Sequence, residues 1–151
     1  MTQTKKRLLP PAYFGIAIVA MVAVHFLAPI ALVLSFPLTL IGLAPIAAGI
    51  ALNLVADRAF KERSTTIKPF ERSTSLVTTG VFAWSRNPMY LGMVLFLLGL
   101  ALLLGTATPF AVIVLFILLL DVKFIRAEER MLAETFGDDW SAYRGQVRRW
   151  L

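Results

Sequence analysis

The stretch LLPPAYFGIAIVAMVAVHFLAPIALVLSFPLTLIGLAPIAAGIALNLVA, residues 8–56, contains no Asp, Glu, Lys or Arg. A second uncharged tract, NPMYLGMVLFLLGLALLLGTATPFAVIVLFILLL, covers residues 87–120. One helical crossing of a bilayer needs about 20 apolar residues, so each tract is long enough to cross twice. The two tracts therefore predict an integral membrane protein built from two helical hairpins.

Breaks within the tracts set the expected helix ends. Pro29 and Ser35-Phe36-Pro37 interrupt the first tract, and the run from Gly105 to Pro109 interrupts the second. Proline and turn residues of this kind end helices. The expected fold is all-α, a single domain over residues 1–151, with a helical C-terminal tail. Its four transmembrane helices are predicted at about residues 12–28, 38–56, 88–104 and 110–125.

The charged residues fall in three segments outside the two tracts. The chain has 15 Lys and Arg residues against 9 Asp and Glu residues, and a net charge of +6. Lys and Arg concentrate on the cytoplasmic side of membrane spans. We therefore expect all three segments and both termini to be cytoplasmic, and the protein to lie in a bacterial inner membrane. Nucleic acid is not the expected partner, because basic residues beside spans set topology and contact lipid headgroups.

The sequence contains no cysteine. This excludes disulfides, thiolate metal ligands and cysteine nucleophiles, and no metal centre is expected. The single histidine, His25, lies inside the first predicted span. Because its tract offers no second ionisable group, we expect His25 to pack against a carbonyl or a turn rather than to act in catalysis.

The middle polar segment, Asp57 to Arg86, is predicted to be a cytoplasmic interfacial loop, with Phe82 and Trp84 as aromatic anchors at the membrane surface. At its end, Asn87 is a favourable N-cap and Pro88 suits the first position of a helix. Arg86 would then stand beside a helix N-terminus, which favours anions. One turn later, Tyr90 places a hydroxyl inside the membrane.

The tail begins with carboxylates close to the end of the fourth predicted span. A carboxylate that faces the bundle at membrane depth is costly without a partner, which favours a functional role for Glu128 or Glu129. The alternative is a set of exposed ion pairs, each worth only a few tenths of a kcal/mol. After Gly137 we expect a second short helix that rests Trp140 and Tyr143 on the lipid headgroups.

Both junctions resemble those of a known family. LVTTGVFAWSRNPMYLG, residues 76–92, resembles the L-V-x-x-G-x-[YF]-x-x-x-R-[HN]-P-x-Y-x-G signature of the isoprenylcysteine carboxyl methyltransferase family. EERMLAETFGDDWSAY, residues 128–143, resembles the same family's E-E-x-x-L-x-x-x-F-G-x-x-[YW]-x-x-Y tail. The resemblance covers roughly the C-terminal half of the chain.

The resemblance implies an integral-membrane methyltransferase that uses S-adenosylmethionine and accepts a lipophilic or lipid substrate from the bilayer. Tyr90, Glu128 and Arg86 are the candidate catalytic residues. The cofactor contacts carried over from the family are Ser75, Leu76, Val77, Phe82, Asn87, Pro88, Met89, Tyr90, Glu128 and Glu129.

Three positions depart from the family pattern, and one of them is Phe82, which lacks the hydroxyl of the family's tyrosine. Asn87 replaces a histidine, and because an amide does not exchange a proton near neutral pH, this position cannot serve as a general base. Phe124 stands where the family has the basic residue that binds the prenylcysteine carboxylate. Lys123 and Arg126, nearby on the same helix, are the candidate substrate contacts.

Other functions remain open from the sequence. The methyl acceptor could be a prenyl carboxylate, a phospholipid amine or another lipophilic group. A membrane reductase of the sterol-reductase type is one alternative, because it shares a similar Gly-x-x-Trp-x-x-Tyr tail and binds a nicotinamide cofactor. A membrane scaffold without enzymatic activity is the other. The sequence does not indicate an oligomeric state.

Overall fold

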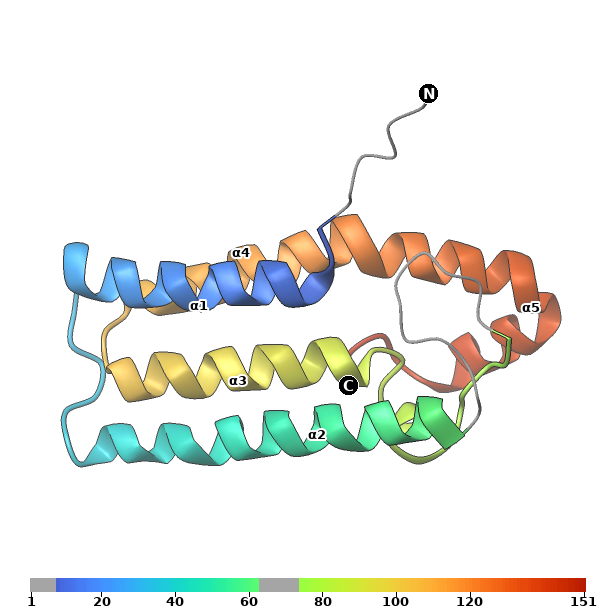
Figure 1. The fold of residues 1–151 in the computed structure, drawn as a ribbon, viewed down its shortest axis with the longest axis horizontal. Coiled ribbons are helices and arrows are strands. Elements are labelled where there is room, and N and C mark those ends of the chain that lie inside the picture. The colour runs from blue at the N-terminus through green and yellow to red at the C-terminus, as the bar shows by residue number, and fades with distance from the viewer. Residues whose placement is uncertain (1–7, 63–73) are drawn as a thin grey trace, which may run out of the picture.

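The computed structural model describes residues 8–62 and 74–151, which form an elongated helical bundle (Figure 1). Within these residues, the one pairing of extended backbone is an isolated bridge between Leu32 and Thr106, so the all-α prediction is confirmed. The cluster Lys5-Lys6-Arg7 and residues 63–73 of the middle segment lie outside the described residues. The main helices are α1 (Pro10–Leu27), α2 (Leu43–Glu62), α3 (Pro88–Leu104), α4 (Thr108–Leu120) and α5 (Arg126–Gln146).

The apolar helices match the predicted spans closely in position. Three continuous helical stretches are long and apolar enough to cross a membrane: Pro10–Leu27, Leu38–Glu62 and Thr108–Gln146. The shorter apolar helix α3 lies against them. The stretch Leu38–Glu62 includes a short 3₁₀ helix, Leu38–Gly42, ahead of α2. The count of four spans remains a prediction, because α3 is shorter than the other three.

Proline and glycine mark the helix ends as expected. Pro10, Pro88 and Pro109 each stand in the first two positions of a helix, where a missing N–H costs nothing. Gly105 ends α3 with a φ of 74°, a left-handed conformation that glycine adopts without strain.

The charged residues gather at one end of the bundle. The two short turns, around residues 28–37 and 105–107, lie at the opposite end from α5 and the segment that precedes α3 (Figure 1). At the uncharged end, backbone bonds from Val33 and Leu34 to the Gly105 carbonyl tie the two turns together. His25 Nδ1 lies 2.8 Å from the Thr106 hydroxyl, so the expected contact with a turn is present.

Helix α3 packs closely against α2 and the 3₁₀ helix before it through two glycine pairs. A Cβ at Gly49 would lie 2.4 Å from the Gly92 carbonyl oxygen, and a Cβ at Gly42 would lie 2.3 Å from the Gly99 carbonyl oxygen. Small residues allow membrane helices to pack at short distance, where dispersion forces replace the hydrophobic effect. This contact fixes the position of the α3 N-terminus relative to α2.

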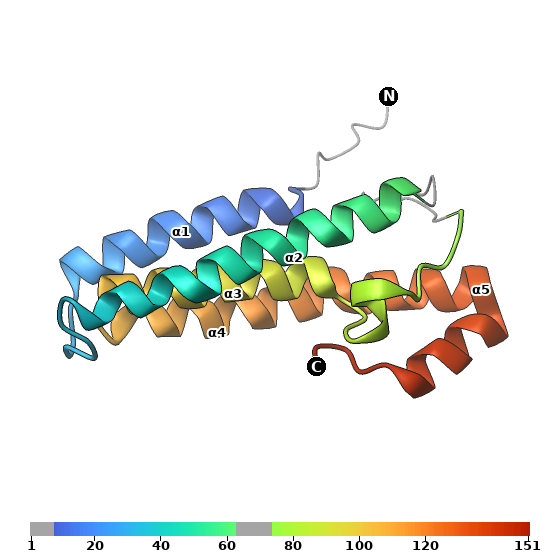
Figure 2. The same cartoon turned by 90° about the horizontal axis from the view of Figure 1, so that it is seen from below.

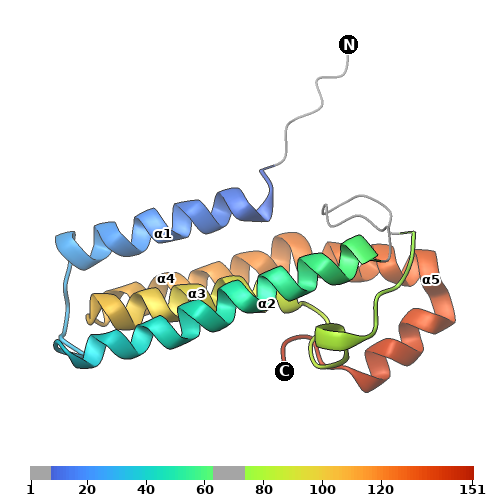
Figure 3. The same cartoon turned by 60° about the horizontal axis from the view of Figure 1, so that its bottom comes forward.

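Helix α4 does not end at residue 125 as a separate span. It continues through one π-helical turn, Asp121–Ile125, directly into α5. The π turn buries two consecutive side chains, with Phe124 and Ile125 exposed by 1% and 0%. At Gly137 the backbone leaves helical geometry (φ 51°, ψ −114°), and α5 bends back (Figures 2 and 3). The predicted break at Gly137 is confirmed, and the chain then returns toward the start of α3.

Candidate active site

A cavity of about 320 Å³ lies at the charged end of the bundle, between the start of α3 and the start of α5. A short 3₁₀ helix, Gly80–Ala83, forms part of its wall. Its lining is mostly apolar with a few polar groups, a composition typical of small-molecule sites. The cavity brings together Ser75, Leu76, Val77, Phe82, Arg86, Asn87, Pro88, Met89, Tyr90, Glu128 and Glu129.

Tyr90 and Glu128 meet across the cavity wall although 38 positions separate them. The Tyr90 hydroxyl donates a hydrogen bond of 2.6 Å to Glu128 Oε1. Tyr90 stands one turn inside α3 and is buried, whereas Glu128 belongs to the first turn of α5. The hydrogen bond holds the carboxylate in one orientation, which a ligand with hydroxyl or amine groups could use.

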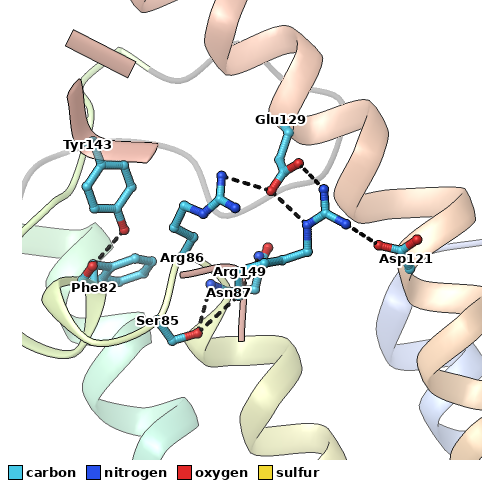
Figure 4. A network of polar contacts seen from close by, with 8 residues as sticks. All are labelled: Phe82, Ser85, Arg86, Asn87, Asp121, Glu129, Tyr143 and Arg149. Carbon is cyan, nitrogen blue, oxygen red and sulfur yellow. Dashed lines mark hydrogen bonds and ion pairs between the residues drawn. The ribbon is translucent and has the colours of Figure 1, made fainter. Parts of the chain in front are cut away.

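A second carboxylate, Glu129, is balanced by two arginines (Figure 4). Arg149 donates from Nε and Nη2 to the two Glu129 oxygens at 3.1 and 2.6 Å, and from Nη1 to Asp121 at 2.8 Å. Arg86 Nη1 lies 3.2 Å from Glu129 Oε1. Such planar, two-point pairing is characteristic of arginine and carboxylate. Glu129 is therefore part of the wall that supports the cavity.

The Arg86 side chain is nine-tenths buried yet incompletely bonded. It is 9% exposed, and its guanidinium carbon lies 5.6 Å from the centre of the Trp140 ring. Among the described residues, Arg86 Nε and Nη1 have no hydrogen-bond acceptor with acceptable geometry. Buried donors without acceptors are uncommon in native proteins, and strain, a catalytic role or a bound water or ion can account for them. Arg86 therefore stands at the cavity with two donors that lack acceptors in the part of the chain that the structure describes.

The C-terminal tail clamps the junction before α3. Arg86 N donates to the Arg148 carbonyl at 3.0 Å, and Asn87 Nδ2 donates to the Arg149 carbonyl at 3.0 Å. The expected side-chain cap is therefore wrong: Asn87 occupies the N-cap position of α3, but its amide bonds to the tail instead of the helix. The buried Ser85 hydroxyl accepts a bond from Asn87 N.

Tyr143 connects the part of α5 beyond Gly137 to the 3₁₀ helix Gly80–Ala83. Its hydroxyl donates to the Phe82 carbonyl at 2.6 Å (Figure 4). Burial raises the pKa of Tyr143 to about 12, and the positive charge of Arg86 offsets part of that rise. The hydrogen bond to Glu129 raises the pKa of Arg149 from its ordinary value. At neutral pH, Tyr143 is therefore a neutral donor and Arg149 is fully charged.

Three aromatic residues expected at the membrane surface are buried instead. Phe82, Trp140 and Tyr143 are exposed by 5%, 3% and 7%. They line the cavity and form part of its aromatic wall. Trp84 differs, because 79% of it is exposed as an interfacial anchor would require.

The two predicted substrate residues lie away from this cavity. Lys123 Nζ donates to the Tyr13 hydroxyl at 2.7 Å and lies 4.8 Å from the centre of that ring. Arg126 pairs with Asp121 at 2.7 Å rather than with Glu129. Phe124 is buried with its ring 5.7 Å from that of Tyr13. Neither Lys123 nor Arg126 lines the cavity.

Sequence reasoning missed the contribution of the first two helices. The segment before and at the start of α1 and the end of α2 carry no recognisable motif, yet both reach the cavity. Leu132, Trp140 and Tyr143 stand at fixed positions of the tail pattern, which could have identified them. The residues added by the structure are Leu9, Pro10, Pro11, Phe60, Met93, Met131, Leu132, Trp140 and Tyr143.

Comparison with known proteins identifies the family. A model of the phospholipid methyltransferase family matches residues 37–139. An uncharacterized protein of Haemophilus influenzae is 40% identical over 63 residues, which are 42% of this chain and all of that protein. The protein-S-isoprenylcysteine O-methyltransferase of Saccharomyces cerevisiae is 41% identical over 75 residues, or 48% of this chain and 30% of the yeast protein.

The fold is also similar to a solved structure. A eukaryotic intramembrane Ras methyltransferase, isoprenylcysteine carboxyl methyltransferase, superposes with a TM-score of 0.69 at 24% sequence identity. The match covers 97% of this chain and 52% of that one, so the chain spans about half the length of the solved relative. The chain belongs to the phospholipid methyltransferase family, and it is an integral membrane protein with an isoprenylcysteine carboxyl methyltransferase-like fold.

Proposed function

We propose that the protein transfers a methyl group from S-adenosylmethionine to a lipophilic acceptor at the cytoplasmic face of the membrane. The observation that carries the proposal is the gathering of every predicted cofactor residue around one cavity. Its volume of about 320 Å³ is within the range of small-molecule sites. The methyltransferase relatives do not favour the reductase or scaffold alternatives.

The polar groups in the cavity suit the chemistry of this cofactor. The Arg86 donors without acceptors fit a carboxylate, and the Glu128 oxygens fit hydroxyl or ammonium groups. Apolar side chains such as Leu76, Val77 and Met89 would enclose the remaining surface. When bound, S-adenosylmethionine supplies an activated methyl group.

In this reaction the residues of the chain would mainly align the methyl donor with the acceptor and exclude water, and proton transfer would be secondary. Closed apolar walls keep water from a reactive group. A carboxylate acceptor is ionised at pH 7 and needs no base. An amine acceptor would need one, and Glu128 is the best placed group, because Glu129 is already paired with Arg149. Asn87 cannot act as that base.

The charge distribution supports the proposed orientation. The described charged residues lie at the cavity end of the bundle, and by the positive-inside rule this supports a cytoplasmic orientation of the cavity and both termini in a bacterial inner membrane. A lipophilic acceptor would then reach the cavity from the surrounding lipid.

The proposal is tested by binding of S-adenosylhomocysteine to the full chain in detergent. We expect this ligand to raise the melting temperature, and NADPH to leave it unchanged. Glu128→Gln should weaken binding by roughly tenfold or more, because it removes a charge-assisted contact. Tyr90→Phe should weaken binding less, since the carboxylate remains.

Two matched variants control for general effects. Glu134→Gln removes an exposed charge from the same helix, and Tyr13→Phe removes a hydroxyl outside the cavity. Both should bind S-adenosylhomocysteine like the parent. Stabilisation by NADPH but not by S-adenosylhomocysteine would replace methyl transfer with reduction. Parent-like affinity in Glu128→Gln and Tyr90→Phe would remove this site assignment.

A further inference from the structure

A second hollow, of about 390 Å³, lies between the two arms of the bent helix α5, the residues before and after Gly137. Figure 2 shows these arms on either side of the bend at Gly137. Arg126 and Arg130 reach the hollow from the first arm, and Arg144 reaches it from the second. Glu129 and Trp140 line both this hollow and the active-site cavity, so they form the wall between the two.

The hollow is strongly positive. Glu129 is the one acidic residue among the described residues that line it, and its carboxylate is already bonded to Arg149 at 2.6 Å. Arg126 is paired with Asp121. Within residues 8–62 and 74–151, Arg130 and Arg144 form no ion pair with any carboxylate. Two exposed guanidinium groups without a carboxylate partner in these ranges therefore line one hollow. The planar N–H groups of a guanidinium can bond to two phosphate oxygens at once.

The same helix face continues from the hollow into the membrane. Val114, Leu118 and Val122 follow one another at intervals of four residues and are exposed by 58%, 57% and 63%. Val122 also lines the hollow. The exposed face thus changes from aliphatic to arginine side chains as α4 passes into α5. In a bilayer, lipid tails cover such aliphatic residues, and lipid phosphates lie where the hydrocarbon ends.

We propose that this hollow binds the phosphate group of a membrane phospholipid, with Arg130 and Arg144 as the principal contacts. One acyl chain of this lipid lies along Val114, Leu118 and Val122. The continuity between the aliphatic face and the arginines favours a lipid over a soluble phosphate. The site is separate from the active-site cavity, and its existence does not depend on methyl transfer.

The test measures lipid retention by the full chain in detergent, using native mass spectrometry and thermal stability. The probe is dioleoylphosphatidylglycerol, compared with dioleoylglycerol, which lacks the phosphate, and with inorganic phosphate alone. We expect the parent to retain the phospholipid and to be stabilised by it, and not by either comparison compound. The double variant Arg130→Gln/Arg144→Gln should lose roughly tenfold or more in affinity for the phospholipid.

The matched control is Arg58→Gln/Arg148→Gln. It removes two exposed positive charges from the same end of the bundle, outside the hollow, and it should retain the lipid like the parent. Equal loss in both double variants would overturn the site in favour of general surface charge. Equal retention of dioleoylglycerol would overturn the role of the phosphate. Stabilisation by inorganic phosphate equal to that by the phospholipid would replace the lipid with a soluble anion.

Folding of the variants is checked by size-exclusion chromatography and by thermal unfolding in the absence of added lipid. If the double variant is not monodisperse, the single variants Arg130→Gln and Arg144→Gln are compared with the single variant Arg58→Gln. Each of the two should then lose part of the affinity, and parent-like retention in both would contradict the proposal.

Discussion

At the residue scale, Arg149 connects parts of the chain that are remote in sequence. Its side chain bonds to Asp121 in the π turn and to Glu129 in α5, and its carbonyl accepts a bond from Asn87 before α3. The positions of Asn87 and Glu129 in the cavity wall therefore depend on Arg149, close to the C-terminal end of the chain. The sequence alone indicated no partner for this arginine.

We expect Arg149→Gln to destabilise the protein by about 2 kcal/mol, because it leaves two partly buried carboxylates short of their charged partner. The measurement is thermal unfolding in detergent. Arg148→Gln is the control: its side chain is exposed, and its carbonyl still accepts the bond from Arg86. Equal melting temperatures for the two variants would contradict this role.

At the scale of elements, the glycine contacts between α2 and α3 set where the active-site helix begins. No Cβ fits at Gly49 without moving the backbone of α3, since Gly92 O and Phe96 N would lie within 2.4 and 2.9 Å. The two helices therefore behave as one rigid pair. That rigidity positions Pro88 and Tyr90 at the cavity.

We expect Gly49→Ala to cost about 1–3 kcal/mol, because it separates two tightly packed helices. Gly15→Ala, in α1, should be neutral or slightly stabilising, since a Cβ there meets no atom within 4 Å and alanine favours helices. Thermal unfolding of both variants checks this. A neutral Gly49→Ala would show that α2 and α3 can separate at little cost.

Most of the helices could be predicted from the sequence because charge, proline and glycine mark their ends directly. The tail was harder. The π turn at Asp121–Ile125 leaves no sequence signal, and it directs Lys123 and Arg126 away from the cavity. The burial of Trp140 and Tyr143 depends on the chain turning back at Gly137 onto the loop before α3. Local sequence determines that a helix breaks, but not where the next helix packs.

At the scale of the whole molecule, the charged end and the turn end should lie on opposite sides of the membrane. The absence of cysteine allows a direct test with single cysteines and a membrane-impermeant maleimide. Ser35→Cys lies in an exposed turn at the uncharged end, and Ala142→Cys lies on the exposed part of α5. In intact cells we expect labelling of Ser35→Cys, and labelling of Ala142→Cys only after permeabilisation. Labelling of both from outside would contradict the predicted orientation.

The π turn between α4 and α5 also determines which way the side chains beyond it point. It accommodates one residue more than an α-helical turn would. If the same five residues, Asp121–Ile125, were wound as regular α-helix instead, everything beyond them would be rotated by about 100°. Glu128 would then swing away from Tyr90 while the helix itself stayed intact. Natural variation should therefore either keep the π geometry of this turn or lose one residue together with it, since both arrangements leave Glu128 facing Tyr90.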